Sequence, residues 1–90
     1  MAQTWLGIKY NLGLGVDQDY KAAAKWYRKA ADQDNALGQL RLASFYSQGK
    51  GVAKNLKEAE KWYLRSVSNS GDYTYAKKMI KEMHSDVKDN

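Results

Sequence analysis

The hydrophobic residues of the chain recur at the spacing of an α-helix. Leu6 and Tyr10 are four positions apart, and Ala23, Tyr27 and Ala30 follow one another at intervals of four and three. Residues three or four apart share one face of a helix, so these segments are expected to be amphipathic helices. The chain has no proline to interrupt a helix, and its seven glycines fall mostly in clusters between the periodic segments. The pattern predicts an all-α protein.

The two halves of the chain repeat each other with a spacing of 36 residues. The stretch GLGVDQDYKAAAKWY at 13–27 returns as GKGVAKNLKEAEKWY at 49–63. A period of about 20 to 50 residues is typical of solenoids, in which each unit buries its apolar face against the next. We therefore predict an α-solenoid of two helix-turn-helix repeats, about 2–35 and 36–71. A closing helix, about 72–87, is predicted to cover the second repeat with a stripe of Ala76, Met79, Ile80, Met83 and Val87.

The Gly-x-Gly-Val motif between the helices of each repeat is interpreted as a hinge. Gly13 and Gly49 stand where a left-handed residue ends a helix, a conformation that glycine adopts without a steric clash. Asp19 and Asn55 are good N-caps for the second helices, and Glu58 follows Asn55 at the spacing of a capping box. A dinucleotide-binding loop would need a preceding strand and a third glycine, and neither copy has them.

Each second helix carries a Trp-Tyr pair, Trp26 with Tyr27 and Trp62 with Tyr63. Such aromatic residues could stack on bases or form a ligand cage. Small residues surround both pairs, which favours large side chains packed into small gaps between stacked helices. We expect these four aromatic residues to belong to the core.

With these motifs the chain resembles the Sel1-like repeat family, a branch of the tetratricopeptide-type helical repeats. The family pattern is Ala-Gln-x-x-Leu-Gly-x-x-Tyr-x-x-Gly-x-Gly-Val, then Asp-x-x-Lys-Ala, then Trp-Tyr-x-Lys-Ala-Ala. The first repeat matches it at Ala2, Gln3, Leu6, Gly7, Tyr10, Gly13, Gly15, Val16, Asp19, Ala23, Trp26, Tyr27, Lys29, Ala30 and Ala31. The second repeat matches it at Gln39, Leu42, Tyr46, Gly49, Gly51, Val52, Ala59, Trp62 and Tyr63, with Ala43 in place of a glycine.

The resemblance implies a protein-interaction module and no enzyme. It suggests a bacterial adaptor, or a small immunity-type inhibitor that sequesters a toxin or a secreted effector. Some cysteine-rich relatives are linked to β-lactam binding or hydrolysis; this chain has no cysteine, so a hydrolase ranks third. The chain departs from the pattern at Asp34, which replaces a glycine, and at Gly71, which arrives one position late.

The net charge of +5 makes nucleic acid the alternative partner. Lys77, Lys78 and Lys81, with lysines of the second helices, would contact the phosphates. Basic and acidic residues alternate along the segment from Lys57 to Lys61, which is typical of a solvated helix face. A protein partner therefore remains the first interpretation.

Candidate catalytic and metal-binding residues are few. The single histidine, His84, has no second metal ligand at a suitable spacing and is expected to face solvent. Asp32, Asp34 and Asn35 resemble the start of a calcium loop but lack the glycine and glutamate that would complete it. We predict no metal, no cofactor and no catalytic site.

The start of the chain does not have the pattern of a signal peptide, and no segment is apolar enough to span a bilayer. These features favour a cytoplasmic location. A periplasmic location remains open if the chain is part of a longer one.

The first helices of such repeats line the concave side of a solenoid. If Leu6 and Tyr10 face the core, helical geometry places the next positions round the helix on the free side. A partner protein or peptide is expected there, with self-association as another possibility, and Trp5 could instead pack on a preceding repeat or a neighbouring molecule. The predicted contact residues are Trp5, Ile8, Asn11, Leu12, Arg41, Ser44 and Gln48.

Overall fold

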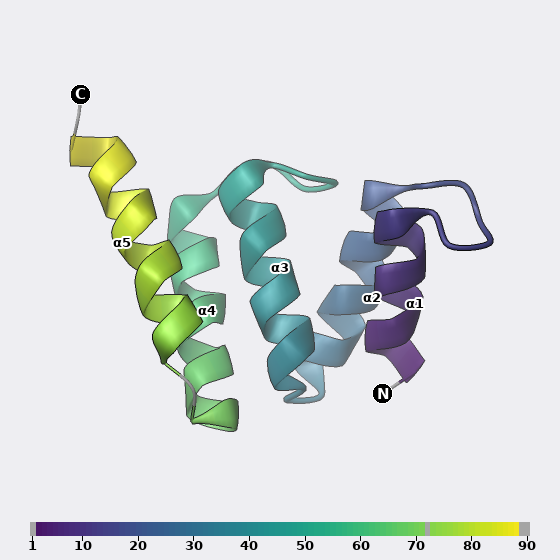
Figure 1. The fold of residues 1–90 in the computed structure, drawn as a ribbon, viewed down its shortest axis with the longest axis horizontal. Coiled ribbons are helices and arrows are strands. Elements are labelled where there is room, and N and C mark those ends of the chain that lie inside the picture. Colours follow the sequence, from purple (N-terminus) through teal and green to yellow (C-terminus); the bar gives the residue numbers. More distant parts are fainter. Residues whose placement is uncertain (1, 72, 89–90) are drawn as a thin grey trace.

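The computed structural model describes residues 2–71 and 73–88, with side chains described for 3–71 and 73–83. The described chain forms the five helices α1 (Ala2–Leu12), α2 (Tyr20–Asp32), α3 (Ala36–Gln48), α4 (Leu56–Ser70) and α5 (Thr74–Lys88). Helices α1, α3 and α5 form the front layer in Figure 1, and α2 and α4 lie behind them. The predicted all-α fold of two helical hairpins and a closing helix is confirmed.

The two glycine hinges have the same geometry. Gly13 and Gly49 adopt left-handed φ angles of 71° and 70°. The amide of the following residue donates to a carbonyl five residues back, from Leu14 N to Lys9 O and from Lys50 N to Phe45 O, both within 3.0 Å. These bonds use carbonyls that would otherwise be left without partners at the helix end. The motif thus serves as a hinge, as predicted.

The second helices begin at the predicted N-caps. The side chain of Asp19 accepts a hydrogen bond from Ala22 N, and that of Asn55 accepts one from Glu58 N, each at 3.1 Å. In a complete capping box the backbone amide of Asn55 would donate to the side chain of Glu58. Here that amide donates instead to Tyr46 O at 2.9 Å. This bond ties the cap to the first helix of the same hairpin, so Glu58 does not have the predicted role.

Three of the four predicted core aromatic residues are buried. Tyr27, Trp62 and Tyr63 are at most 2% exposed. Trp26 is only half-buried, which corrects its prediction. Trp62 lies at the junction of the two hairpins. The guanidinium group of Arg28, which belongs to α2, is 5.4 Å from the centre of the Trp62 ring. Among the described helices none stands in the corresponding place beside Trp26, so its ring keeps a solvent-facing side.

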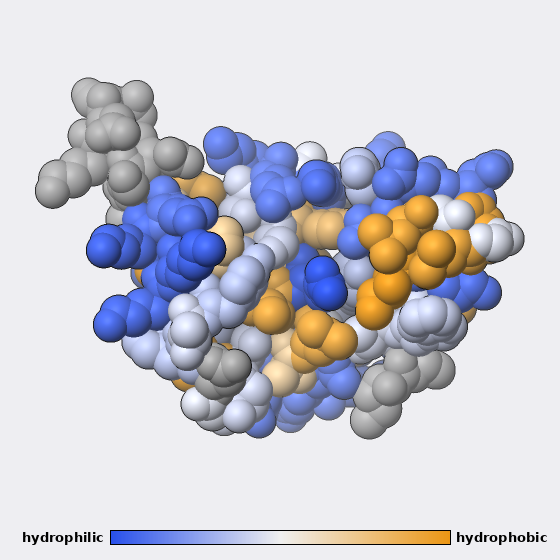
Figure 2. All heavy atoms as spheres, viewed as in Figure 1, coloured by the Kyte–Doolittle hydropathy of each residue, from blue (hydrophilic) through white to orange (hydrophobic). Residues whose placement is uncertain are grey.

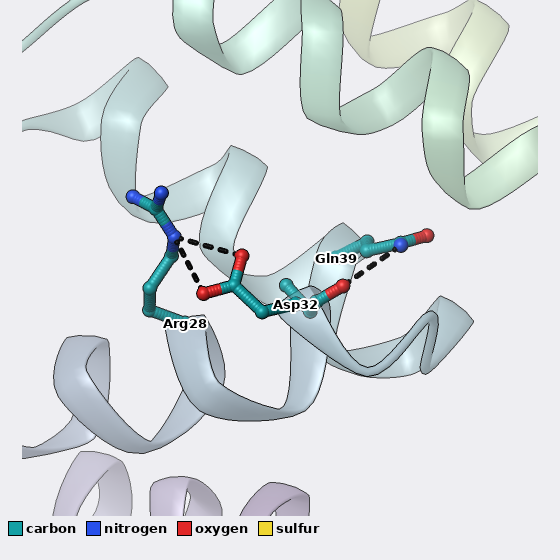
Figure 3. A network of polar contacts seen from close by, with 4 residues as sticks. Arg28, Asp32 and Gln39 are labelled. Atoms are coloured by element: carbon teal, nitrogen blue, oxygen red, sulfur yellow. Dashed lines mark hydrogen bonds and ion pairs between the residues drawn. The ribbon is translucent and has the colours of Figure 1, made fainter.

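A buried glutamine connects three helices. Gln39 of α3 has no exposed surface, and its amide nitrogen donates to Ala31 O at the end of α2 at 3.1 Å (Figure 3). Its side-chain oxygen accepts a hydrogen bond of 2.9 Å from Asn69 of α4. Burying a side-chain amide costs free energy unless its polar atoms have hydrogen-bond partners. These bonds therefore fix where the second hairpin packs on the first. Nearby, Arg28 and Asp32 form an ion pair at 3.1 Å on the surface of α2.

The two departures from the family pattern are accommodated locally. Asp34 adopts a positive φ of 62°, as expected for a residue that replaces a glycine. Gly71 is the left-handed C-cap of α4, and α5 then packs on α4. Ala76 and Met83 of the predicted stripe are buried. Met79 and Ile80 are half-buried against the core, and Val87 lies outside the described side chains.

Candidate protein-interaction face

The predicted contact residues lie on α1 and α3, in the front layer. Trp5 and Leu12 are 55% and 60% exposed, and Arg41 and Gln48 are also exposed. In α1 the opposite side is buried at Thr4 and Gly7. Figure 2 shows a large apolar group on the surface over α1. We use the term interaction face for the solvent side of α1, α3 and α5.

The other predicted contact residues are half-buried: Ile8, Asn11 and Ser44. The side-chain amide of Asn11 donates to Tyr27 Oη at 3.4 Å, and Ser44 Oγ lies 3.1 Å from Tyr63 Oη. These polar residues thus hold the hydroxyl groups of two tyrosines that reach forward from the second helices. Helical spacing could not reveal this role, because it assigns a residue to a side of its own helix and not to a neighbour.

Burial raises the pKa of Tyr27 above its usual value, because the phenolate would lose solvation. The hydrogen bond from Asn11 and the positive charge of Arg41 oppose this increase in pKa without cancelling it. Burial likewise raises the pKa of Tyr63, and the neighbouring hydroxyl groups of Ser44 and Ser47 oppose this increase without cancelling it. Both hydroxyl groups are therefore neutral at physiological pH and act as hydrogen-bonding groups.

The interaction face also contains apolar residues that the sequence prediction missed. Leu37 is 42% exposed and Tyr75 is 44% exposed. With Leu40 and Ala76 they line a pocket of about 280 Å³ between α3 and α5. Figure 2 shows a second, smaller group of apolar atoms over the lower, N-terminal half of α3. The spacing of Leu37 and Arg41, four residues apart on α3, was a signal for a shared face.

The described side chains offer little for catalysis or metal binding. Within residues 3–71 and 73–83 no three His, Cys, Asp or Glu side chains are grouped to hold a metal ion. Asp32 pairs with Arg28, and Asp19 caps α2. His84 lies outside the described side chains. In the described part of the chain, no helix combines the length and the hydropathy needed to cross a membrane.

Ser47 and Lys50 have the Ser-x-x-Lys spacing found in some acyl-transfer enzymes, a further candidate for catalysis in the sequence. Ser47 Oγ donates to Ser44 O at 2.9 Å. The ammonium group of Lys50 lies 5.2 Å from the ring centre of Tyr20. The serine hydroxyl is thus bonded to its own helix while the lysine is directed to an aromatic ring, so the spacing does not form a serine-lysine pair.

Comparison with known proteins finds a family and related structures. A Sel1 repeat protein from Oxalobacter formigenes has a TM-score of 0.80 and 37% sequence identity over 88% of this chain and 32% of its own. The cysteine rich protein B (HcpB) of Helicobacter pylori has a TM-score of 0.73 and 34% identity over 76% of this chain and 51% of its own. The chain thus spans about a third and about half of these two proteins. No protein of curated function matches. The family model of the Sel1 repeat matches residues 1–35 and 36–70, and the chain belongs to the Sel1 repeat family.

Proposed function

We propose that this chain is a non-catalytic interaction module that binds a partner protein on its interaction face. The observation that carries the proposal is the exposure of Trp5 and Leu12 on the same face as Arg41. Tryptophan and arginine are the residues that most often dominate the energy of a protein interface. Contiguous exposed apolar residues on a soluble surface often mark such an interface.

Within this role we propose an adaptor or a small immunity-type inhibitor that sequesters a toxin or an effector. A Sel1 repeat domain supports the general scaffold role. The inhibitor role requires only one rigid, preformed surface, and a pair of hairpins joined by buried bonds such as those of Gln39 supplies rigidity. The module would then act by covering a surface of its partner.

Affinity capture from the native organism tests the proposal. The bait is the wild-type chain, and the variants are Trp5→Ala and Arg41→Ala, with Lys57→Ala on the outer face of α4 as a matched control. Trp5→Ala and Arg41→Ala should each lower the affinity for the purified cognate partner by more than about fivefold, or about 1 kcal/mol. The helical circular dichroism signal should stay unchanged. Equal binding by all four proteins would contradict the proposal.

Nucleic acid is the alternative partner, because Lys77, Lys78 and Lys81 are exposed on α5. Phosphate contacts make binding strongly dependent on salt. Titration of generic DNA and RNA at low and at moderate salt separates the two functions. A tight complex at low salt that weakens steeply would favour nucleic acid, whereas absence of binding at low salt would leave the protein partner.

A further inference from the structure

The space between α3 and α5 forms an open groove. Two pockets of about 210 and 280 Å³ lie side by side along it and share Leu40 and Tyr75 as lining residues. A third, of about 170 Å³, lies toward the C-terminal end of α3 and is lined by Gln48 and Met79, among others. The corresponding space between α1 and α3 is bridged by a hydrogen bond of 3.0 Å from Thr4 Oγ1 to Asn35 Oδ1.

Tyr75 of α5 replaces the small residue that α3 has at the corresponding position. In α3, Gly38 comes directly before the buried Gln39, and a Cβ at Gly38 would lie only 2.7 Å from the Cβ of Ala30. The glycine therefore lets α3 pack closely on α2. In α5 the residue before the buried Ala76 is Tyr75, whose ring makes an edge contact with Tyr63 at 6.5 Å. A large ring thus stands in α5 where α3 has a glycine, and this ring lines both pockets of the groove between α3 and α5.

The groove changes in character along its length. At the N-terminal end of α3 the lining is mainly apolar and includes the exposed Leu37, with Ser66 and Ser70 of α4 as its polar residues. One helical turn further on, the lining includes the exposed Arg41. Among the described side chains, no carboxylate lines either of these two pockets. Leu37 and Arg41 are four residues apart on one helix face, where Cβ atoms are about 5 to 6 Å apart.

We infer that this groove binds a segment of a partner protein in which a bulky aliphatic or aromatic side chain lies one helical turn from an Asp or Glu. The apolar side chain enters the pocket lined by Leu37, Leu40 and Tyr75, and the carboxylate pairs with Arg41. The net charge of +5 attracts such an acidic segment, and the pairing with Arg41 fixes its orientation. Burial of the apolar side chain supplies affinity. The inference rests on the proposed function and specifies the chemistry of the partner.

A charge exchange tests the inference with a library of displayed helical peptides. The full chain and the variant Arg41→Glu are used as separate targets, with Lys57→Glu as a control that makes the same charge change on the outer face of α4. The wild type and the control should enrich peptides with an acidic residue three or four positions from Leu, Ile, Phe or Trp. Arg41→Glu should enrich a lysine or arginine at that place.

The enriched peptide is then synthesised and its affinity measured by fluorescence anisotropy. It should bind Arg41→Ala and Leu37→Ser at least fivefold more weakly than the wild type, and a peptide with the acid changed to lysine should recover binding to Arg41→Glu. Leu37 and Arg41 are exposed, so these variants should retain the fold, which circular dichroism checks.

Two results would overturn the inference. One is a selection on the wild-type chain that enriches no peptides, or that enriches peptides with no preference for an acidic residue. The other is a peptide whose binding depends on Trp5 but not on Leu37 or Arg41; it would move the site to α1 and leave the proposed interaction face intact. The proposed function itself fails if a captured natural partner binds Trp5→Ala and Arg41→Ala as tightly as the wild type.

Discussion

The ring of Tyr27 occupies the space that a side chain at Gly7 would need. A Cβ built on Gly7 would lie 2.5 Å from both Cδ1 and Cε1 of this ring, which is completely buried. The contact brings α1 against α2 more closely than any larger residue at position 7 would permit. Substitution of Gly7 therefore tests how closely α1 and α2 pack in the first hairpin.

Gly7→Ala should destabilise the protein. The steric cost of overpacking is about 1 to 3 kcal/mol, and the better helix propensity of alanine offsets about 1 kcal/mol of it. At the equivalent position of the second hairpin the protein has a buried Ala43, and Ala43→Gly should also destabilise it, because a methyl group and helix propensity are lost. Urea denaturation of both variants checks this. A gain in unfolding free energy for Gly7→Ala would refute the packing.

Gly51→Ala should be more harmful than Gly15→Ala. Both glycines have a left-handed φ, 70° and 77°, so both substitutions cost about 1 to 2 kcal/mol for that conformation. A Cβ at Gly51 would in addition collide with the backbone of Tyr20 at the start of α2, whereas a Cβ at Gly15 meets nothing within 4 Å. Equilibrium unfolding should show a difference of at least about 1 kcal/mol. Equal losses would show that the second hinge does not touch α2 in solution.

The two tryptophans should differ in their contribution to stability. Trp62→Ala should lower the free energy of unfolding by about 3 to 5 kcal/mol, because the ring is 2% exposed between the hairpins. Trp26→Ala should cost less, because part of its ring already faces solvent. Thermal unfolding of the two variants provides the comparison. A larger loss for Trp26 would mean that its exposed side is covered in solution.

The N-cap of α4 should act through Asn55 alone. Asn55→Ala removes the bond from Glu58 N and should cost about 1 kcal/mol. Glu58→Ala should change the unfolding free energy much less, because the amide that a capping box would use is already bonded to Tyr46 O, and the better helix propensity of alanine offsets the lost charge near the helix N-terminus. Denaturant titrations of the single variants distinguish the two residues. A loss for Glu58→Ala as large as that for Asn55→Ala would show that the Glu58 side chain also caps the helix.

Stability should decrease in alkaline solution through Tyr27 and Tyr63. Burial raises the pKa of both phenols above the usual 10.0, so the unfolded chain loses these protons at a lower pH than the folded protein. The stabilisation that these two phenols contribute is complete below pH 10. It is lost as the pH rises through their pKa values in the folded protein. Unfolding free energies measured across this range, with tyrosinate absorbance, test it. Tyr27→Phe and Tyr63→Phe should each flatten the dependence.

The local features of this fold could be predicted because they depend on a few adjacent residues. A glycine in the left-handed region ends a helix wherever it occurs, and Gly13 and Gly49 do so. Asp19 and Asn55 cap their helices with their own side chains. Trp5 and Leu12 could be assigned to a free side because the period of an α-helix determines which residues share a face.

Only the tertiary structure decided which surfaces meet and how closely. The distance between two packed helices depends on side chains from both of them, so the open groove at Tyr75 and the contact of Gly7 with Tyr27 had no signal in either segment alone. The different burial of Trp26 and Trp62 likewise depends on the neighbouring helix, since the two residues occupy the same place in the repeat. A repeated sequence determines repeated helices, and the neighbours of each helix determine what remains exposed to a partner.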